Sequence, residues 1–187
     1  KGTGFVYIRK GHDLNALICG GGQEQGLRGG TENVAGIVGL AKALEVAHRD
    51  LDGNQTKISK LKQYLISRLA LSGIEGICYN GESKSVETSL ANVLSVSLPC
   101  LAAGSIVERL NEAGIYVSGG SACSGAAPSH VIKALACEAA KENVRFSFSK
   151  FNSFDELDQI AEALVAIYET EPVFSTRSAW KRIASWA

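Results

Sequence analysis

The sequence has no excess of charge of either sign and no cluster of basic residues. Its 187 residues include nineteen Lys and Arg and nineteen Asp and Glu, so the formal net charge is zero. Proteins that bind nucleic acid concentrate Lys and Arg on one face or along one segment, and this chain has no such segment. We therefore expect no nucleic-acid partner, and the balanced charge favours a small neutral or zwitterionic ligand.

Long hydrophobic runs are missing as well. No segment approaches the roughly 18 to 20 consecutive apolar residues of a transmembrane helix. The first residues carry no apolar core of a signal peptide. We therefore expect no membrane association and a cytoplasmic location. Because the chain opens without methionine and runs at once into the β-rich residues 5–8, we also expect it to be part of a longer protein.

The cysteines lack the spacing of a zinc site or of a disulfide framework. They are five in number and no two form a Cys-x-x-Cys pair, so reduced thiols are expected. Four of them stand beside apolar residues, which is typical of small buried side chains: Cys19, Cys78, Cys100 and Cys137.

Cys123 has different neighbours. It lies in the segment VSGGSACSGAAPSHV (117–131), which consists mostly of glycine, alanine and serine. Small side chains make few packing contacts, so such a loop suits a thiol that moves. Backbone amides in the loop and a helix beginning near Pro128 would favour the reactive thiolate. His130 is a candidate base, although a single histidine at a helix start is more often structural. The loop predicts a mobile nucleophile or a sulfur carrier.

Arg145 is the second candidate functional residue. It interrupts the alternating apolar pattern of NVRFSFSKF (143–151). A guanidinium group binds carboxylates in bidentate fashion, so an arginine at such a position indicates a carboxylate partner. That partner is either an Asp or Glu of the protein, which is the usual case, or the α-carboxylate of an amino acid.

The segment before the first predicted helix is rich in glycine. GGGQEQGLRGG (20–30) contains six glycines, which allow either positive φ angles and close approach to a ligand, or a flexible connection. A helical pattern begins at Thr31, the expected N-cap, and a second one follows an expected break near residues 52–54.

The remaining patterns alternate between strand and helix, which predicts an α/β or α+β fold. Strands are expected at 5–8, 77–79, 93–98, 115–117 and 144–148. Helices are expected at 105–113, from about Pro128, and after the capping box that Ser153 and Glu156 form.

Five segments in order resemble the C-terminal half of the cysteine desulfurases that serve iron–sulfur cluster assembly. They are KGTGFVYIRKG, GGGQEQGLRGGTENVAGIVGLAKALEVA, VSGGSACSG, PSHVIKAL and VRFSFSKFNSFDELDQIAEAL, and the similarity runs from Lys1 to about Tyr168. The resemblance implies a pyridoxal 5'-phosphate (PLP) transferase of fold type I, in which the end of the large domain (1–48) precedes a small α+β domain (49–170) and a C-terminal tail (171–187). It also implies a homodimer.

The resemblance implies roles for three residues. Cys123 matches the nucleophile that takes sulfur from L-cysteine, becomes a persulfide and leaves L-alanine. Arg145 matches the arginine that binds the substrate α-carboxylate. Thr31 matches the residue that reaches the PLP phosphate of the second subunit of the homodimer. An iron–sulfur scaffold, or another acceptor protein, would then receive the sulfur.

Two features depart from the family pattern. The Schiff-base lysine of the family precedes the position that Lys1 matches, so we expect the isolated chain to be inactive. The cysteine loop is also shorter, with four residues between Cys123 and Pro128. A selenocysteine lyase, another class V aminotransferase relative and a non-enzymatic sulfur-carrier or partner-binding lobe stay open as alternatives.

Overall fold

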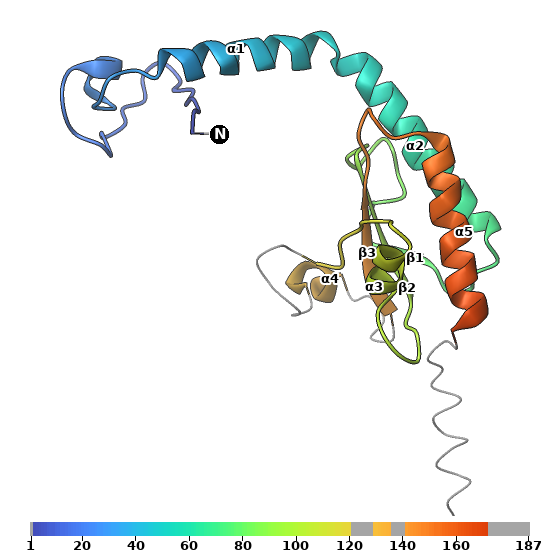
Figure 1. Cartoon of the computed structure of the whole chain (residues 1–187). Coiled ribbons are helices and arrows are strands. Elements are labelled where there is room, and N and C mark those ends of the chain that lie inside the picture. The colour runs from blue at the N-terminus through green and yellow to red at the C-terminus, as the bar shows by residue number, and fades with distance from the viewer. Residues whose placement is uncertain (1, 121–128, 136–140, 172–187) are drawn as a thin grey trace, which may run out of the picture. The chain divides into compact units, whose positions relative to one another are not determined.

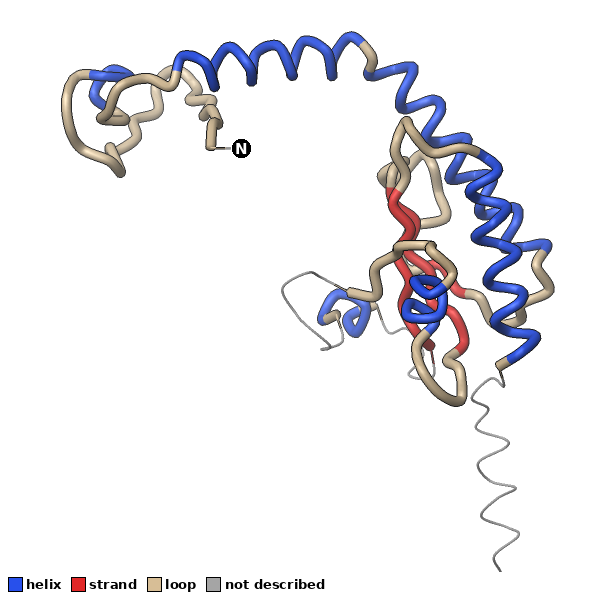
Figure 2. The backbone as a smooth tube through the Cα atoms, viewed as in Figure 1, coloured by secondary structure: helices blue, strands red, loops and turns tan. Residues whose placement is uncertain are grey.

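The computed structural model describes residues 2–120, 129–135 and 141–171 (Figures 1 and 2). The chain divides into two compact units, Lys1–Asp52 and Gly53–Ala187. Within the described residues, no helix combines the length and apolar character that crossing a membrane requires. Cys123, Pro128, Cys137 and the tail after Glu171 lie outside the described residues.

The first unit consists of extended segments, a short 3-10 helix η1 (Gln23–Gly26) and helix α1 (Val34–Arg49). The strand predicted at residues 5–8 is wrong, because no strand is assigned there. Phe5 and Tyr7 are 77% and 82% exposed. A strand requires a partner for its backbone hydrogen bonds, and among the described residues of this unit none pairs with that segment.

Helix α1 begins later than the sequence pattern indicates. Its N-cap is Asn33, whose side-chain oxygen accepts a hydrogen bond from the Gly36 N–H at 3.1 Å. The prediction that Thr31 is the N-cap is therefore wrong. Asn33 is the N-cap instead of Thr31 because it stands directly before the first helical residue, Val34. Asparagine is also at least as favourable as threonine at the N-cap position.

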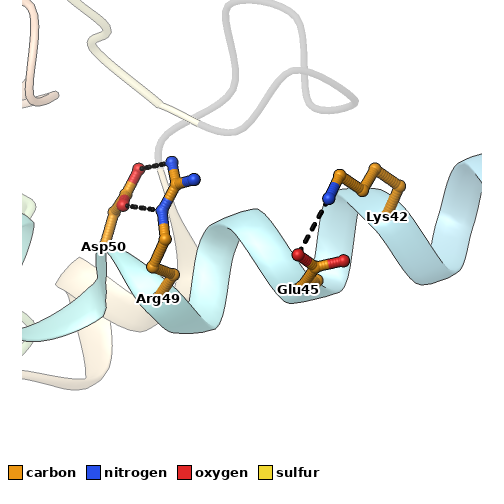
Figure 3. A network of polar contacts seen from close by, with 4 residues as sticks. All are labelled: Lys42, Glu45, Arg49 and Asp50. Carbon is orange, nitrogen blue, oxygen red and sulfur yellow. Dashed lines mark hydrogen bonds and ion pairs between the residues drawn. The ribbon is translucent and has the colours of Figure 1, made fainter.

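The break between the first two long helices also differs from the prediction. Helix α1 ends at Arg49, Asp50 is its C-cap, and α2 (Leu51–Leu71) follows at once, so Gly53 lies inside a helix. The Arg49 guanidinium contacts both carboxylate oxygens of Asp50, at 2.7 and 3.1 Å (Figure 3). One turn earlier, Lys42 pairs with Glu45 at 2.8 Å (Figure 3). Both cations and Glu45 are exposed and Asp50 is half-buried, so each pair stabilises α1 only slightly.

The described residues of the second unit form a three-stranded antiparallel sheet covered by helices. Its strands, in the spatial order β1-β2-β3, are β1 (Cys78–Tyr79), β2 (Val93–Pro99) and β3 (Lys141–Ser147). Its other helices are α3 (Ile106–Glu112), α4 (His130–Ala134) and α5 (Phe154–Thr170). The predicted strand at 115–117 is wrong, because only Ser118 forms an isolated bridge.

One face of the sheet is apolar and contacts helices α2, α3 and α5. The buried cluster contains Leu94, Val96 and Leu98 of β2, Val144 and Phe146 of β3, Leu61, Leu65 and Leu69 of α2, Ile106 and Leu110 of α3, and Leu157 and Leu164 of α5. Alternate residues of a strand point to opposite faces. The other face of the same strands therefore carries Ser95, Ser97, Asn143 and Arg145.

Helices α2 and α5 lie side by side over the apolar face (Figure 2). Asp158 accepts a hydrogen bond from the Tyr64 hydroxyl at 2.8 Å and pairs with Arg68 at 2.8 Å. Helix α5 begins at the predicted capping box, in which Ser153 and Glu156 exchange hydrogen bonds. This prediction is confirmed. The pKa of Glu156 lies below its ordinary value, chiefly because Asn152 donates a hydrogen bond to the carboxylate.

Candidate functional site

The polar face of the sheet presents Arg145 to solvent. Arg145 lies in β3 opposite Ser95 of β2, and its side chain is exposed. Among the described residues, no carboxylate forms an ion pair with Arg145. The described protein therefore supplies no structural partner for this guanidinium, which favours the second interpretation of the sequence, a carboxylate ligand.

The other edge of β3 holds the start of the cysteine loop. Ser118 pairs with Arg145 in an isolated antiparallel bridge. The Arg145 N–H donates to the Ser118 carbonyl at 2.7 Å, and the Ser118 N–H donates to the Arg145 carbonyl at 3.3 Å. Two of the sequence features, the loop and the arginine, are thus brought together by the backbone itself, although Cys123 lies outside the described residues.

A network of hydrogen bonds fills the polar face beside Arg145. The Asn143 side-chain oxygen accepts from Asn80 Nδ2 at 2.6 Å and from Ser95 Oγ at 3.0 Å. Ser97 Oγ donates to Asn80 Oδ1 at 2.7 Å. On its other side, Asn143 Nδ2 donates to the Gly119 carbonyl at 3.3 Å. The network therefore connects β2, β3 and Asn80, the residue that follows β1, to the loop that leads to Cys123.

Sequence patterns did not identify Asn80 or Asn143 as site residues. Asparagine is disfavoured inside strands, so an asparagine two positions before Arg145 on the same face was a usable signal. Asn80 is 63 residues away from its partner Asn143, and no local pattern connects them.

The opposite face of β3 is fixed to helix α3. The Glu142 carboxylate accepts hydrogen bonds from Ser105 Oγ at 2.6 Å and from the Ile106 N–H at 2.8 Å. A carboxylate at this position stabilises a helix N-terminus. Burial raises the pKa of the Cys100 thiol, and the negative charge of Glu142 raises it further. Cys100 is therefore protonated at neutral pH and is not an activated nucleophile.

Helix α4 follows the cysteine loop. It begins at His130, and its N-cap is Ser129, whose hydroxyl accepts from the Ile132 N–H at 3.5 Å. His130, the candidate base, is exposed. The apolar side chains of Val131 and Leu135 in this helix are 54% and 47% exposed. Leu135 lies beside the turn at Gly81, at 3.8 Å from the position that a Cβ would occupy there.

In the first unit, a tight loop holds Thr31. Ile18 and Arg28 form an isolated parallel bridge, and the Gly29 N–H donates to the Ile18 carbonyl at 2.9 Å. Gly29 is buried against Gly20, and a Cβ on Gly29 would lie 2.8 Å from the Gly20 Cα atom. The loop therefore requires glycine at this position. Thr31 follows two residues later, with an exposed side chain.

Comparison with known proteins identifies relatives over most of the chain. The model of the aminotransferase class-V family matches residues 1–160. A protein named cysteine desulfurase from Bradyrhizobium diazoefficiens is 42% identical over 166 residues, which are 85% of this chain and 40% of the relative. A protein named cysteine desulfurase IscS from Dictyoglomus turgidum is 35% identical over 186 residues, which are 97% of this chain and 46% of the relative.

Solved structures agree with these matches. A NifS-like protein superposes with a TM-score of 0.69 at 36% identity and covers 87% of this chain and 41% of its own. The NifS-like protein from Rickettsia africae has a TM-score of 0.64 at 27% identity, and the match covers 85% of this chain and 41% of that one. The chain thus spans less than half of the length of the relatives it matches.

These matches confirm the predicted resemblance to cysteine desulfurases. They also confirm the predicted fold class, which is fold type I of the PLP-dependent transferases. The chain belongs to the aminotransferase class-V family.

Proposed function

We propose that the chain is the C-terminal portion of a PLP-dependent cysteine desulfurase. One observation in the structure supports this most strongly, namely the backbone pairing of Ser118 with Arg145. It attaches the segment that leads to Cys123 directly to the arginine that would bind the substrate. Relatives named cysteine desulfurase support the same activity.

Arg145 would hold the α-carboxylate of L-cysteine. Its guanidinium is exposed on the polar face, and a bidentate pair with the carboxylate would fix the orientation of the substrate. Cys123 would attack the substrate sulfur as a thiolate. A new S–S bond forms, the C–S bond of the substrate breaks, and the carbon fragment takes up a proton and leaves as L-alanine. Cys123 is left as a persulfide.

Thr31 would contact the phosphate of PLP across the interface of a homodimer. The hydroxyl of Thr31 is a hydrogen-bond donor on an exposed side chain. The tight packing of Gly29 on Gly20 fixes the loop that carries it. These residues fit a phosphate group. When bound, PLP supplies an electron sink that weakens the C–S bond of the substrate.

The persulfide sulfur would pass to an iron–sulfur scaffold or to another acceptor protein in the cytoplasm. The composition of segment 117–131, mostly glycine, alanine and serine, suits this transfer, because such residues would let Cys123 reach first the substrate and then an acceptor thiol.

The proposed activity is tested with a full-length desulfurase that carries this chain as its C-terminal portion. Incubation with L-cysteine and a thiol reductant should release alanine and sulfide in equal amounts. A parallel assay with L-selenocysteine separates the proposed activity from that of a selenocysteine lyase. Turnover of selenocysteine alone would contradict the proposal.

A further inference from the structure

We propose that Asn143 is a positioning residue that fixes Gly119 as the point where the cysteine loop leaves the sheet. The inference rests on the proposed function, because it concerns the path of the thiol of Cys123. It is carried by the hydrogen bond from Asn143 Nδ2 to the Gly119 carbonyl, 3.3 Å in length.

The orientation of the Asn143 amide is determined by its neighbours. Ser97 Oγ donates to Asn80 Oδ1, which leaves the Asn80 amino group to donate to Asn143 Oδ1 at 2.6 Å. Ser95 donates to the same oxygen at 3.0 Å. With its oxygen engaged by two donors, Asn143 directs its amino group toward Gly119.

Two successive residues of the loop, Ser118 and Gly119, are thus held by one strand, β3. Ser118 is bound through its backbone to Arg145, and Gly119 is bound through its carbonyl to Asn143. Asn143 and Arg145 are two residues apart in β3 and share the polar face. The residue that would bind the substrate and the residue that anchors the loop are therefore placed on the same rigid element.

The anchor sets the reach of the nucleophile. Cys123 is four residues after Gly119, and at about 3.5 Å per residue an extended chain lets it travel about 14 Å from the anchor. If Gly119 is released, Ser118 becomes the anchor and the reach grows to about 17 Å. The volume that the thiol samples then about doubles, so its effective concentration at the substrate falls by about half.

Two variants separate the anchor from the rest of the network. Asn143→Asp keeps an oxygen that accepts from Asn80 and Ser95 but removes the donor to Gly119. Asn143→Ala removes all three bonds. Tyr64→Phe is the control, because it removes a hydrogen bond of the same unit, from the Tyr64 hydroxyl to Asp158, on the helix-covered side of the sheet.

Two measurements in the full-length enzyme test the proposal. The first is amide hydrogen exchange at Ser118, which should be about two- to tenfold faster in both Asn143 variants, as expected for loss of one hydrogen bond. The second is the single-turnover rate of persulfide formation on Cys123 at saturating L-cysteine, which should fall at least about twofold. Tyr64→Phe should match the wild type in both.

Three results would each contradict one claim: the anchoring of Gly119 by Asn143, its role in positioning Cys123, or the proposed function. Unchanged exchange at Ser118 in Asn143→Asp would overturn the anchor. Faster exchange with an unchanged persulfide rate would overturn its role in positioning Cys123. If the wild-type enzyme forms no persulfide on Cys123, the proposed function fails, and the exchange measurement still decides whether Asn143 anchors the loop.

Discussion

Ser118 and Arg145 exchange two backbone hydrogen bonds, with N–O distances of 2.7 and 3.3 Å. Through this pair, the segment leading to Cys123 is attached to the edge of β3 that faces away from β2. A substrate held by the Arg145 side chain would therefore lie near the base of the cysteine loop, and a single strand would organise both halves of the proposed reaction.

Replacing Arg145 with alanine should mainly weaken substrate binding. Loss of a charge-assisted pair with the α-carboxylate should raise the KM for L-cysteine about 30-fold or more. Lys150→Ala is the control, because it removes an exposed cation that lies over Phe151 rather than on the polar face. An unchanged KM in Arg145→Ala would show that the guanidinium does not bind the substrate.

The loop before Thr31 should not tolerate a side chain at Gly29. Gly29→Ala places a Cβ within 2.8 Å of Gly20 backbone atoms, so the loop must move. We expect weaker PLP binding by the full-length enzyme, measured from its absorbance as the cofactor is titrated. Gly22→Ala is the matched control, because a Cβ at Gly22 meets nothing within 4 Å and its φ of −81° suits alanine. Equal PLP affinity in the two variants would argue against Thr31 as a phosphate ligand.

Lys62 should make the free energy of unfolding of the second unit depend on pH in the alkaline range. It is fully buried in α2, and its ammonium group donates to Ser89 Oγ at 2.6 Å and to the Leu90 carbonyl at 2.9 Å. Burial lowers the pKa of Lys62 below its ordinary value of 10.5. Between the lowered pKa and 10.5, the unfolded chain binds more protons than the folded chain, so the free energy of unfolding rises with pH.

This dependence is isolated by comparison with Lys62→Met. The free energy of unfolding of the wild type, measured by urea denaturation and circular dichroism, should increase relative to that of Lys62→Met as the pH approaches 10.5. A difference that is constant over this range would show that burial of Lys62 does not perturb its titration.

Features encoded by neighbouring residues were predicted well from the sequence. The capping box of Ser153 and Glu156 depends on residues three positions apart, and it occurs as expected. The β-rich run 93–98 corresponds to β2, Val93–Pro99. Every second residue of β2 is apolar and points to the helix-covered face, and the residues between them point to the polar face.

Features that depend on distant partners were predicted less well. The run at 5–8 has strand-forming residues but no partner strand among the described residues, so its pattern alone was insufficient. The site network likewise depends on Asn80, Ser95 and Asn143, which come from separate parts of the chain. Arg145 was identified because one cation in an apolar strand is conspicuous, whereas an asparagine that anchors a loop is not.

The most direct test of the proposed function is the position of the persulfide. A full-length desulfurase carrying this chain is incubated with L-cysteine alone, and its peptides are examined by mass spectrometry. The peptide with Cys123 should gain the mass of one sulfur atom, and Cys123→Ala should abolish sulfide release while the PLP absorbance persists. Cys78→Ser should behave as wild type. It removes a thiol of β1 that the sequence pattern predicted to be buried but that is exposed in the structure. A persulfide on another cysteine, or sulfide release by Cys123→Ala at the wild-type rate, would contradict the role proposed for Cys123.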